Sequence, residues 1–284
     1  MKRSLRPLLS NDRTTVLPGV GDALGAILAA EAGFPAAYMS GYYVSAVLGY
    51  FDVGLISSTE MVTQAARICA AADIPVLVDA DTGYGNAINV IRTVREYEAA
   101  GAAGMHLEDQ DQPKKCGHLH GLVLVSAREM SAKIEAAVDA RSTEDFLVIA
   151  RTDALSTAGM DEAIRRGREY RAAGADAIMV MAPRSVADLE RFRAGVDGPL
   201  VCTVGAWPFN VSADDLTRIG YQLALFTVST LRRAIAAMRE TLAALRRDGA
   251  LDHSAPGMIS MNDMHRLLGQ DRIQAWEKRY ASDE

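Results

Sequence analysis

The chain has 284 residues, and 36 acidic against 30 basic side chains give it a formal net charge of −6. This length fits one large α/β barrel or two smaller domains. A content of 49% hydrophobic and 23% charged residues is typical of a globular protein and argues against a disordered one. The negative charge gives no reason to expect nucleic acid or an anionic membrane as a partner. The longest apolar runs are about strand length, so we expect no segment that crosses a bilayer.

The basic N-terminus, Met1–Pro7, has no apolar region behind it, so we expect no signal peptide. Three widely spaced cysteines, Cys69, Cys116 and Cys202, do not form the even set that a disulfide framework needs. A reducing cytoplasm is the compartment that this pattern predicts.

Short β-rich runs alternate with amphipathic helical segments up to about residue 247. Most of these runs are continuously apolar, as in strands buried on both faces of a parallel sheet. The predicted strands are Thr15–Leu17, Ala36–Met39, Val76–Asp79, Gly104–Glu108, Phe146–Ala150, Ala177–Met181, Leu200–Val204 and Leu223–Phe226. The predicted helices between them include Asp22–Ala32, Thr59–Ala72, Asn89–Ala100, Ala127–Ala140, Met160–Ala173 and Ser185–Ala194.

Eight such units predict a (β/α)8 TIM-type barrel. A doubly wound open sheet is the alternative, but no Gly-rich dinucleotide fingerprint follows the first strand. Beyond the eighth strand, the pattern predicts a long helix over Thr230–Arg247 and a further polar helical stretch over Met261–Tyr280. We therefore predict a single barrel domain over residues 1–284, with residues 230–284 as a C-terminal helical extension.

Acidic residues end two neighbouring predicted strands. Asp79 and Asp81 lie two apart after Val76-Leu77-Val78, so they share a face, and Glu108 ends the next strand. Carboxylates that share a site repel each other unless a cation or proton lies between them. Three hard oxygen donors predict Mg²⁺, with Mn²⁺ as an alternative ion. The competing interpretation is that an aspartate caps the following helix.

The segment Lys114-Lys115-Cys116-Gly117-His118 is the second signal. A cysteine beside lysines and a histidine is in a setting that lowers a thiol pKa, and such a thiol can act as a general acid or base. The alternative is a buried, inert cysteine flanked by two solvated lysines. His106 lies inside the fourth strand, and we expect it to be a hydrogen-bonded core residue.

Arg151 ends the fifth predicted strand. An arginine at that place, over a cation site, can hold a substrate carboxylate with two parallel hydrogen bonds. The alternative is an ion pair with Asp153 or with another carboxylate of the barrel ring.

These motifs resemble the isocitrate lyase / phosphoenolpyruvate mutase superfamily over nearly the whole chain. The residues that carry the resemblance are Ser40-Gly41, the run Asp79–Gly85, Leu107–Gln110, Lys114–His118 and Ala150–Ala154. The Lys-Cys-Gly-His loop resembles the lyase branch, which includes methylisocitrate and dimethylmalate lyases. The extended loop through Gly121 also resembles the carboxyvinyl-carboxyphosphonate phosphorylmutase type.

The resemblance implies roles for individual residues. It implies that Asp81 binds Mg²⁺ most directly, and that Cys116 moves the proton at the carbon where the bond breaks. The metal would be supported by Asp52, Asp79 and Glu108. The carboxylate end would be held by Tyr38, Ser40, Gly41 and Arg151, with further substrate binding by Tyr42 and Gly117. Catalysis would also involve His118 and Tyr38. It also implies a homotetramer, a dimer of dimers, in which the C-terminal helix is exchanged between subunits.

The sequence departs from the family pattern away from the metal. Leu119 and Leu122 replace an arginine and a lysine, and Met181 or Ala182 stands where tricarboxylate lyases have a glutamate. Cys202-Thr203-Val204-Gly205-Ala206-Trp207 lacks their Asn and Glu, and Thr227-Val228 replaces a proline-containing segment. A distal carboxylate would remain unpaired in such a pocket. We expect a substrate with one 2-oxo or 2-hydroxy carboxylate group and an apolar or bulky distal part.

The predicted function is therefore Mg²⁺-dependent cleavage of a carbon–carbon bond in a small carboxylate of the methylisocitrate or dimethylmalate type. Two alternatives stay open. One is an oxaloacetate-type decarboxylase or hydrolase, or a mutase-like enzyme acting on a P–C bond. The other is a non-catalytic binding relative.

Overall fold

The computed structural model describes residues 4–205, 207, 209–252 and 257–281. It divides into two compact units, Met1–Leu231 and Arg232–Glu284. Within the described ranges, no helix combines the length and the apolar character that crossing a bilayer requires.

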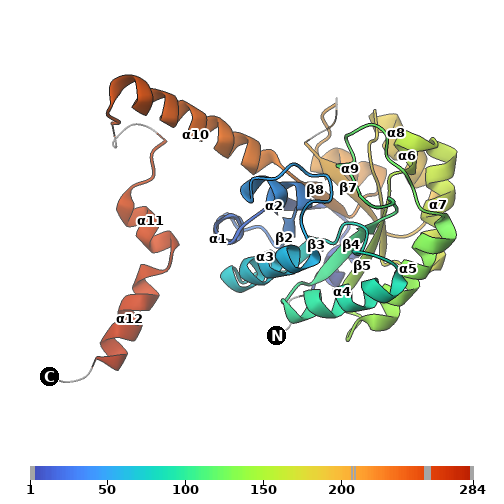
Figure 1. The fold of residues 1–284 in the computed structure, drawn as a ribbon, viewed down its shortest axis with the longest axis horizontal. Helices are drawn as coiled ribbons and strands as arrows, with labels where there is room; N and C mark the ends of the chain where they lie inside the picture. The colour runs from blue at the N-terminus through green and yellow to red at the C-terminus, as the bar shows by residue number, and fades with distance from the viewer. Residues whose placement is uncertain (1–3, 206, 208, 253–256, 282–284) are drawn as a thin grey trace. The chain divides into compact units, whose positions relative to one another are not determined.

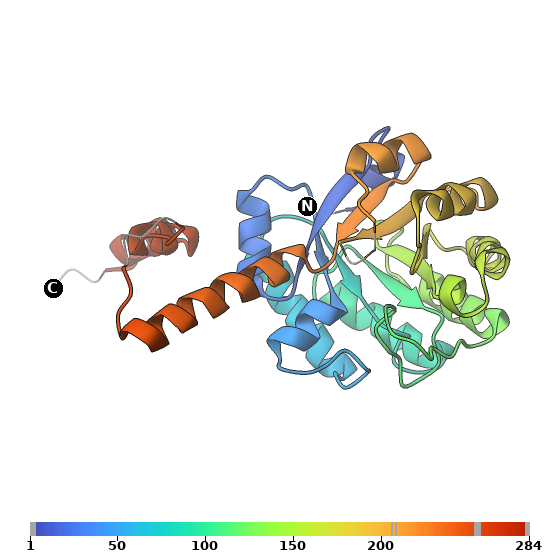
Figure 2. The same cartoon turned by 90° about the horizontal axis from the view of Figure 1, so that it is seen from above.

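The first unit contains a closed barrel of eight parallel strands, each hydrogen-bonded to the next and β8 to β1 (Figures 1 and 2). This confirms the predicted TIM-type fold and rules out the open sheet. The strands are β1 (Thr15–Val20), β2 (Ala37–Met39), β3 (Val76–Asp79), β4 (Gly104–Glu108), β5 (Leu147–Thr152), β6 (Ala177–Val180), β7 (Leu200–Val204) and β8 (Leu223–Phe226).

Helices surround this barrel, and the sequence predicted most of them to within one or two residues. They are α1 (Ala23–Glu31), α2 (Gly41–Val47), α3 (Ser58–Ala71), α4 (Ala87–Ala99), α5 (Ala127–Ala140), α6 (Ala154–Thr157), α7 (Met160–Ala172), α8 (Val186–Gly195) and α9 (Ala213–Ile219), with a 3₁₀ helix η1 (Arg6–Ser10) before β1. The short helices α2, α6 and α9 were not predicted, because each is too brief to show a helical period.

The strands have two buried faces, and alternate residues fill two separate cores. Leu17, Leu77, Ile149, Val201 and Leu225 are among the side chains that pack together inside the barrel. Their neighbours along the strands pack outward against the helices in a second, larger core. The direction of any side chain at a strand end therefore follows from its position in this alternation.

α10 (Ser229–Asp248) begins in the first unit and continues into the second, which also holds α11 (Met261–Leu267) and α12 (Gln270–Tyr280). The single stretch predicted over Met261–Tyr280 is thus two helices, separated at Gly269, whose φ of 85° an L-residue rarely adopts. The assignment of residues 230–284 as an extension of one domain, and the exchange of its helix between subunits, stay predictions.

Candidate active site

The carboxyl ends of β2 to β5 bring the predicted site residues together at one mouth of the barrel. Asp79 and Arg151 stand two residues beyond Leu77 and Ile149, so they continue the inward face of β3 and β5. Glu108 on β4 is the cross-strand partner of Arg151. All three side chains are buried, as are Asp52, in the loop between α2 and α3, and Asp81, in the loop that follows β3.

Asp79 organises the end of β3 and the start of α2. One of its carboxylate oxygens accepts hydrogen bonds from the Gly41 amide at 3.0 Å and the Tyr38 hydroxyl at 3.3 Å, and the other accepts from the Asp81 amide at 3.0 Å. A Cβ at Gly41 would lie 2.7 Å from Asp79 Oδ2, so only glycine permits this approach. Burial opposes ionisation, but His106, Lys114 and Arg151 lower the pKa of Asp79 to about 2.

Two predicted substrate-binding residues, Ser40 and Tyr42, are not linked to the acidic cluster by any hydrogen bond of the described side chains. Ser40 is buried and caps α2, accepting a hydrogen bond from the Tyr43 amide. Tyr42 is exposed on α2. Their predicted roles in substrate binding stay predictions.

His106 lies beside Asp79 inside the barrel, as predicted for a hydrogen-bonded core residue. It is fully buried, and its Nε2 is 2.9 Å from the Tyr38 hydroxyl and 3.4 Å from Asp79 Oδ1. Burial lowers the pKa of His106 to about 4, so the ring is neutral at pH 7. Tyr38 is thereby held between two members of the site.

Lys114 is a site residue that the sequence interpretation missed. The alternative of two solvated lysines is wrong for Lys114, which is buried and pairs with Asp52 and, at 2.7 Å, with Asp81. The loop carrying Lys114 folds back over the barrel mouth, where the Cys116 amide donates to the Asp52 carbonyl at 3.0 Å. The motif Lys114–His118 contained this signal, but only the fold reveals which lysine turns inward.

The buried charges of the mouth favour a cation. Asp52, Asp79, Asp81, Glu108 and Asp153 face Lys114 and Arg151, five acids against two bases, an excess of three acids. Burial raises the pKa of Asp81 to about 6 and also raises that of Glu108, which means that both carboxylates lack sufficient compensation for their charge. Glu108 Oε1 and Asp81 Oδ1 have no hydrogen-bond donor, although Asp81 Oδ1 lies near the Lys114 ammonium.

These residues fit a magnesium ion. In the described part of the chain, no three His, Cys, Asp or Glu side chains converge closely enough to bind one ion together. Mg²⁺ does not need such a cage, because it keeps several waters and takes one or two carboxylates. Asp81 and Glu108 offer oxygens of the correct kind.

Arg151 is engaged with two carboxylates, as the alternative interpretation of this residue stated. Its Nε and Nη2 donate to the two oxygens of Asp153 at 3.0 and 2.9 Å, and its Nη1 is 2.7 Å from Glu108 Oε2. These contacts use three of the five N–H donors of a guanidinium. One N–H on each of Nη1 and Nη2 is left over, which is the pair that a substrate carboxylate would need.

The loop with Cys116, Gly117 and His118 covers Arg151. A Cβ at Gly117 would lie 2.5 Å from Arg151 Nη2 and 2.7 Å from Met181 Cγ, so this contact requires glycine. Burial raises the pKa of the Cys116 thiol, so the expected lowering by neighbouring cations is wrong. His118 is exposed and packs on Trp207, with the ring centroids 4.7 Å apart.

The wall beyond Gly117 is largely apolar. Met181 is buried and receives the Thr203 hydroxyl at 3.6 Å from its sulfur, and the Trp207 indole donates to the Thr203 carbonyl. Ala182 has a φ of 60°, a left-handed conformation unusual for alanine. Ala206, part of the departure noted in the sequence, lies outside the described residues.

Comparison with known proteins gives consistent matches. The model of the phosphoenolpyruvate phosphomutase family matches residues 5–246. The chain is 42% identical over 282 residues to 2,3-dimethylmalate lyase of Eubacterium barkeri, covering 98% of this chain and 97% of that protein. A structure of oxaloacetate acetylhydrolase with the inhibitor 3,3-difluorooxalacetate has a TM-score of 0.92 and 35% identity, covering 99% and 97% of the two chains. A phosphonopyruvate hydrolase complex with oxalate and Mg²⁺ has a TM-score of 0.90 and 34% identity, covering 98% of each chain.

Proposed function

Because the chain belongs to the phosphoenolpyruvate phosphomutase family, within the isocitrate lyase / phosphoenolpyruvate mutase superfamily that its motifs predicted, we propose that it is a Mg²⁺-dependent carbon–carbon lyase. Its substrate is a small 2-hydroxy or 2-oxo carboxylate of the dimethylmalate or methylisocitrate type. The prediction of an enzyme of this superfamily is confirmed, while the substrate and the metal belong to the proposal.

One observation carries the proposal: donor-free carboxylate oxygens lie next to unused arginine donors. Glu108 Oε1 has no hydrogen-bond partner, and the other oxygen of the same carboxylate pairs with Arg151 at 2.7 Å. A cation site and a carboxylate site therefore share a wall. A substrate that presents a carboxylate and an adjacent oxygen would satisfy both.

Asp81 and Glu108, supported by Asp52 and Asp79, would hold the ion. When bound, Mg²⁺ supplies Lewis-acid stabilisation of negative charge that develops on substrate oxygens. Arg151 would hold the carboxylate, with Tyr38 and Gly41 at the same end through their hydrogen bonds to Asp79, and Ser40 is proposed to add to this end from its place next to Gly41. The hydroxyl loses its proton to a base, the electron pair of the breaking C–C bond passes to the leaving carbon, and the Cys116 thiol donates its proton there.

The raised pKa of Cys116 suits this role. A general acid must hold its proton until the carbanion forms, and burial keeps the thiol neutral at pH 7. Gly117 and His118 complete the loop, Gly117 by its close approach to Arg151 and His118 by its contact with Trp207. The role of Cys116 is thus proton donation rather than attack as a thiolate.

The distal wall selects among the substrates. Met181 and Leu119 offer no cationic or donor group to a third carboxylate, and the hydroxyl of Thr203 is directed to the Met181 sulfur. Leaving a buried polar group unpaired costs about 1–3 kcal/mol, and more for a charge, so the penalty in binding is at least about fivefold. We therefore place 2,3-dimethylmalate ahead of 2-methylisocitrate.

The test is turnover of the purified protein on both acids, each with MgCl₂ and with EDTA. Cleavage of 2,3-dimethylmalate that requires Mg²⁺ supports the proposal. Turnover that is unchanged in EDTA contradicts the metal role. Absence of cleavage with either acid, while Mg²⁺ still binds, contradicts the lyase assignment.

A second candidate is hydrolysis or decarboxylation of oxaloacetate. It is favoured by the similarity in fold to oxaloacetate acetylhydrolase. Oxaloacetate and phosphonopyruvate belong in the same assay panel, where turnover of either would replace the lyase proposal. A non-catalytic relative would show neither turnover nor affinity for Mg²⁺ or Mn²⁺ in a titration.

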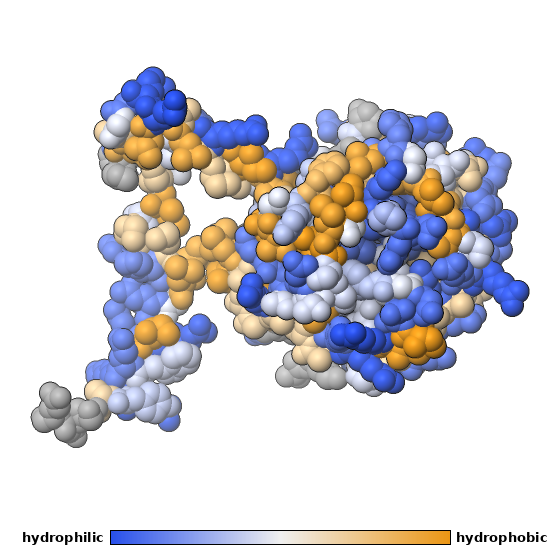
Figure 3. All heavy atoms as spheres, viewed as in Figure 1, coloured by the Kyte–Doolittle hydropathy of each residue, from blue (hydrophilic) through white to orange (hydrophobic). Residues whose placement is uncertain are grey.

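We propose that the protein acts in the cytoplasm as a homotetramer, a dimer of dimers. Exposed Met238, Leu242 and Leu245 form one stripe on α10, beside strongly hydrophilic side chains (Figure 3). An apolar stripe of this kind indicates association with another surface. Light scattering coupled to size-exclusion chromatography distinguishes a mass of four chains from that of one.

A further inference from the structure

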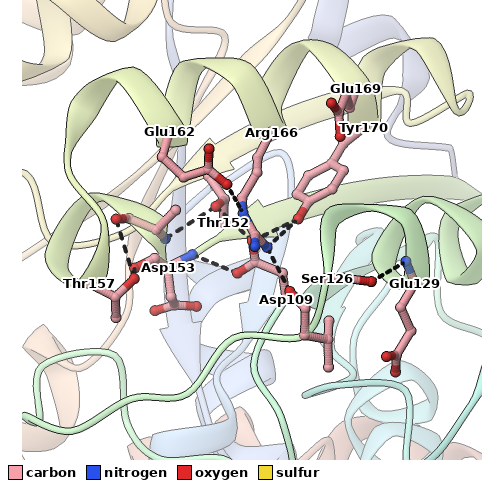
Figure 4. Close-up of polar contacts among 12 residues, drawn as sticks. Asp109, Ser126, Glu129, Thr152, Asp153, Thr157, Glu162, Arg166, Glu169 and Tyr170 are labelled. Carbon is pink, nitrogen blue, oxygen red and sulfur yellow. Dashed lines mark hydrogen bonds and ion pairs between the residues drawn. The ribbon is translucent and has the colours of Figure 1, made fainter.

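A buried polar network lies behind the active site, between β4, β5 and α7 (Figure 4). Its centre is Asp109, whose side chain is completely buried. One carboxylate oxygen accepts from the Thr152 hydroxyl at 2.8 Å, the Tyr170 hydroxyl at 2.8 Å and Arg166 Nη1 at 3.0 Å. The other accepts from the Asp153 amide at 2.9 Å.

Asp109 and Glu108 are adjacent but face opposite sides of β4. Glu108 points into the barrel mouth toward Arg151, whereas Asp109 points outward to the helices. Arg166 is itself fixed at three further points, by Glu162 at 2.8 Å, the Val125 carbonyl at 3.0 Å and the Tyr170 hydroxyl at 3.0 Å. The outer network is therefore rigidly attached to α7.

Asp153 links the two sides. Its amide is held by Asp109, while its carboxylate holds the Arg151 guanidinium through two hydrogen bonds. Arg151 has no other carboxylate partner among the described residues except Glu108. The orientation of the substrate-facing N–H pair thus depends on where Asp153 is placed.

We propose that Asp109, with Arg166 and Tyr170, is a positioning unit that sets the orientation of Arg151 through Asp153. This inference rests on the proposed carboxylate-binding role of Arg151 and deepens it. None of the three residues touches the substrate. Each of them affects the affinity of Arg151 for the substrate carboxylate and does not change the affinity of the site for the metal ion.

Tyr170→Phe is the mild test, because it removes one hydroxyl and keeps the ring. Tyr221→Phe is the matched control, since Tyr221 is equally buried but its hydroxyl donates to the Leu189 carbonyl, at 3.2 Å. The probe is oxalate in the presence of Mg²⁺, measured by titration calorimetry. Tyr170→Phe removes one of the four hydrogen bonds to the Asp109 carboxylate, and the part of that loss that reaches Arg151 is expected to weaken oxalate binding by about fivefold. Tyr221→Phe should bind oxalate like the wild type.

Affinity for Mn²⁺, followed by electron paramagnetic resonance, should be the same in the wild type, Tyr170→Phe and Tyr221→Phe. In Asp109→Asn, the amide N–H group would face at least one hydrogen-bond donor of the network. This variant should therefore weaken oxalate binding more than Tyr170→Phe does. If Asp109→Asn does not fold, the comparison of Tyr170→Phe with Tyr221→Phe is sufficient to test the positioning role.

The positioning role is overturned if Tyr170→Phe binds oxalate as the wild type does, or if Tyr221→Phe weakens it equally. It is also overturned if the wild type with Mg²⁺ does not bind oxalate. A wild type that binds oxalate but cleaves no substrate contradicts the proposed function only, and the ratio of dissociation constants still tests the network.

Discussion

Lys114 and Asp81 form a buried ion pair, with Nζ 2.7 Å from Oδ1, at the point where Mg²⁺ is expected. The ammonium group partly compensates the acidic cluster, yet Glu108 Oε1 still lacks a donor. The lysine and the ion would therefore share Asp81, whereas Glu108 Oε1 is available to the ion alone. Replacement of Lys114 or Asp81 should therefore change the metal affinity of the remaining carboxylates.

Asp81→Asn should weaken Mn²⁺ binding by about tenfold or more, because it removes a hard anionic donor from the cluster. Asp214→Asn is a suitable control, since Asp214 pairs with Arg13 on the surface. Electron paramagnetic resonance of free Mn²⁺ gives both affinities. Equal affinity of Asp81→Asn and the wild type would remove Asp81 from the metal site.

Cys116→Ser should reduce turnover by roughly 10²–10⁴-fold, the usual contribution of a positioned acid. Its Mn²⁺ affinity should stay within about twofold of the wild type, because the thiol is not among the carboxylate donors. Cys69→Ser, on α3, is the control and should remain active. A fully active Cys116→Ser enzyme would exclude the proton-donor role.

Alkylation of Cys116 should accelerate with pH. Only the thiolate reacts, and burial raises the thiol pKa above its ordinary value of 9.0, so the thiolate forms only at higher pH. Reaction with iodoacetamide should be slow at pH 7 and still rising at pH 9, as peptide mass spectrometry can follow. Cys202, with its pKa raised by burial to about 12, should remain unlabelled. A rate that is already maximal at pH 7 would show that the thiol is ionised.

Gly117→Ala should impair substrate binding without disturbing the metal. The added methyl group would meet Arg151, Met181 and Asp153 within 2.5–2.8 Å, and relieving such an overlap costs about 1–3 kcal/mol. The expected result is a rise of about fivefold or more in the oxalate dissociation constant, with Mn²⁺ affinity as in the wild type. Wild-type oxalate affinity would mean that the loop moves freely away from Arg151.

The sequence was sufficient for the barrel and for the grouping of Asp79, Glu108 and Arg151, because strand ends of a parallel barrel must meet. It was insufficient where loops fold back. Nothing in Lys114-Lys115 shows that the first side chain turns inward, and the burial that raises the pKa of Cys116 depends on the same fold. Asp153 was considered only as a competitor of the substrate for Arg151, since its link to Asp109 requires two strands in register.

The opposite orientation of Glu108 and Asp109 has a consequence for how β4 can change. A deletion or insertion of one residue within the strand exchanges the two sides, sending the site carboxylate outward and the supporting one into the mouth. Substitutions at the outward apolar positions Met105 and Leu107 can be absorbed by repacking, but a shift of the strand by one residue cannot. Deletion scanning of the gene should therefore find β4 far less tolerant than the exposed ends of its surrounding helices.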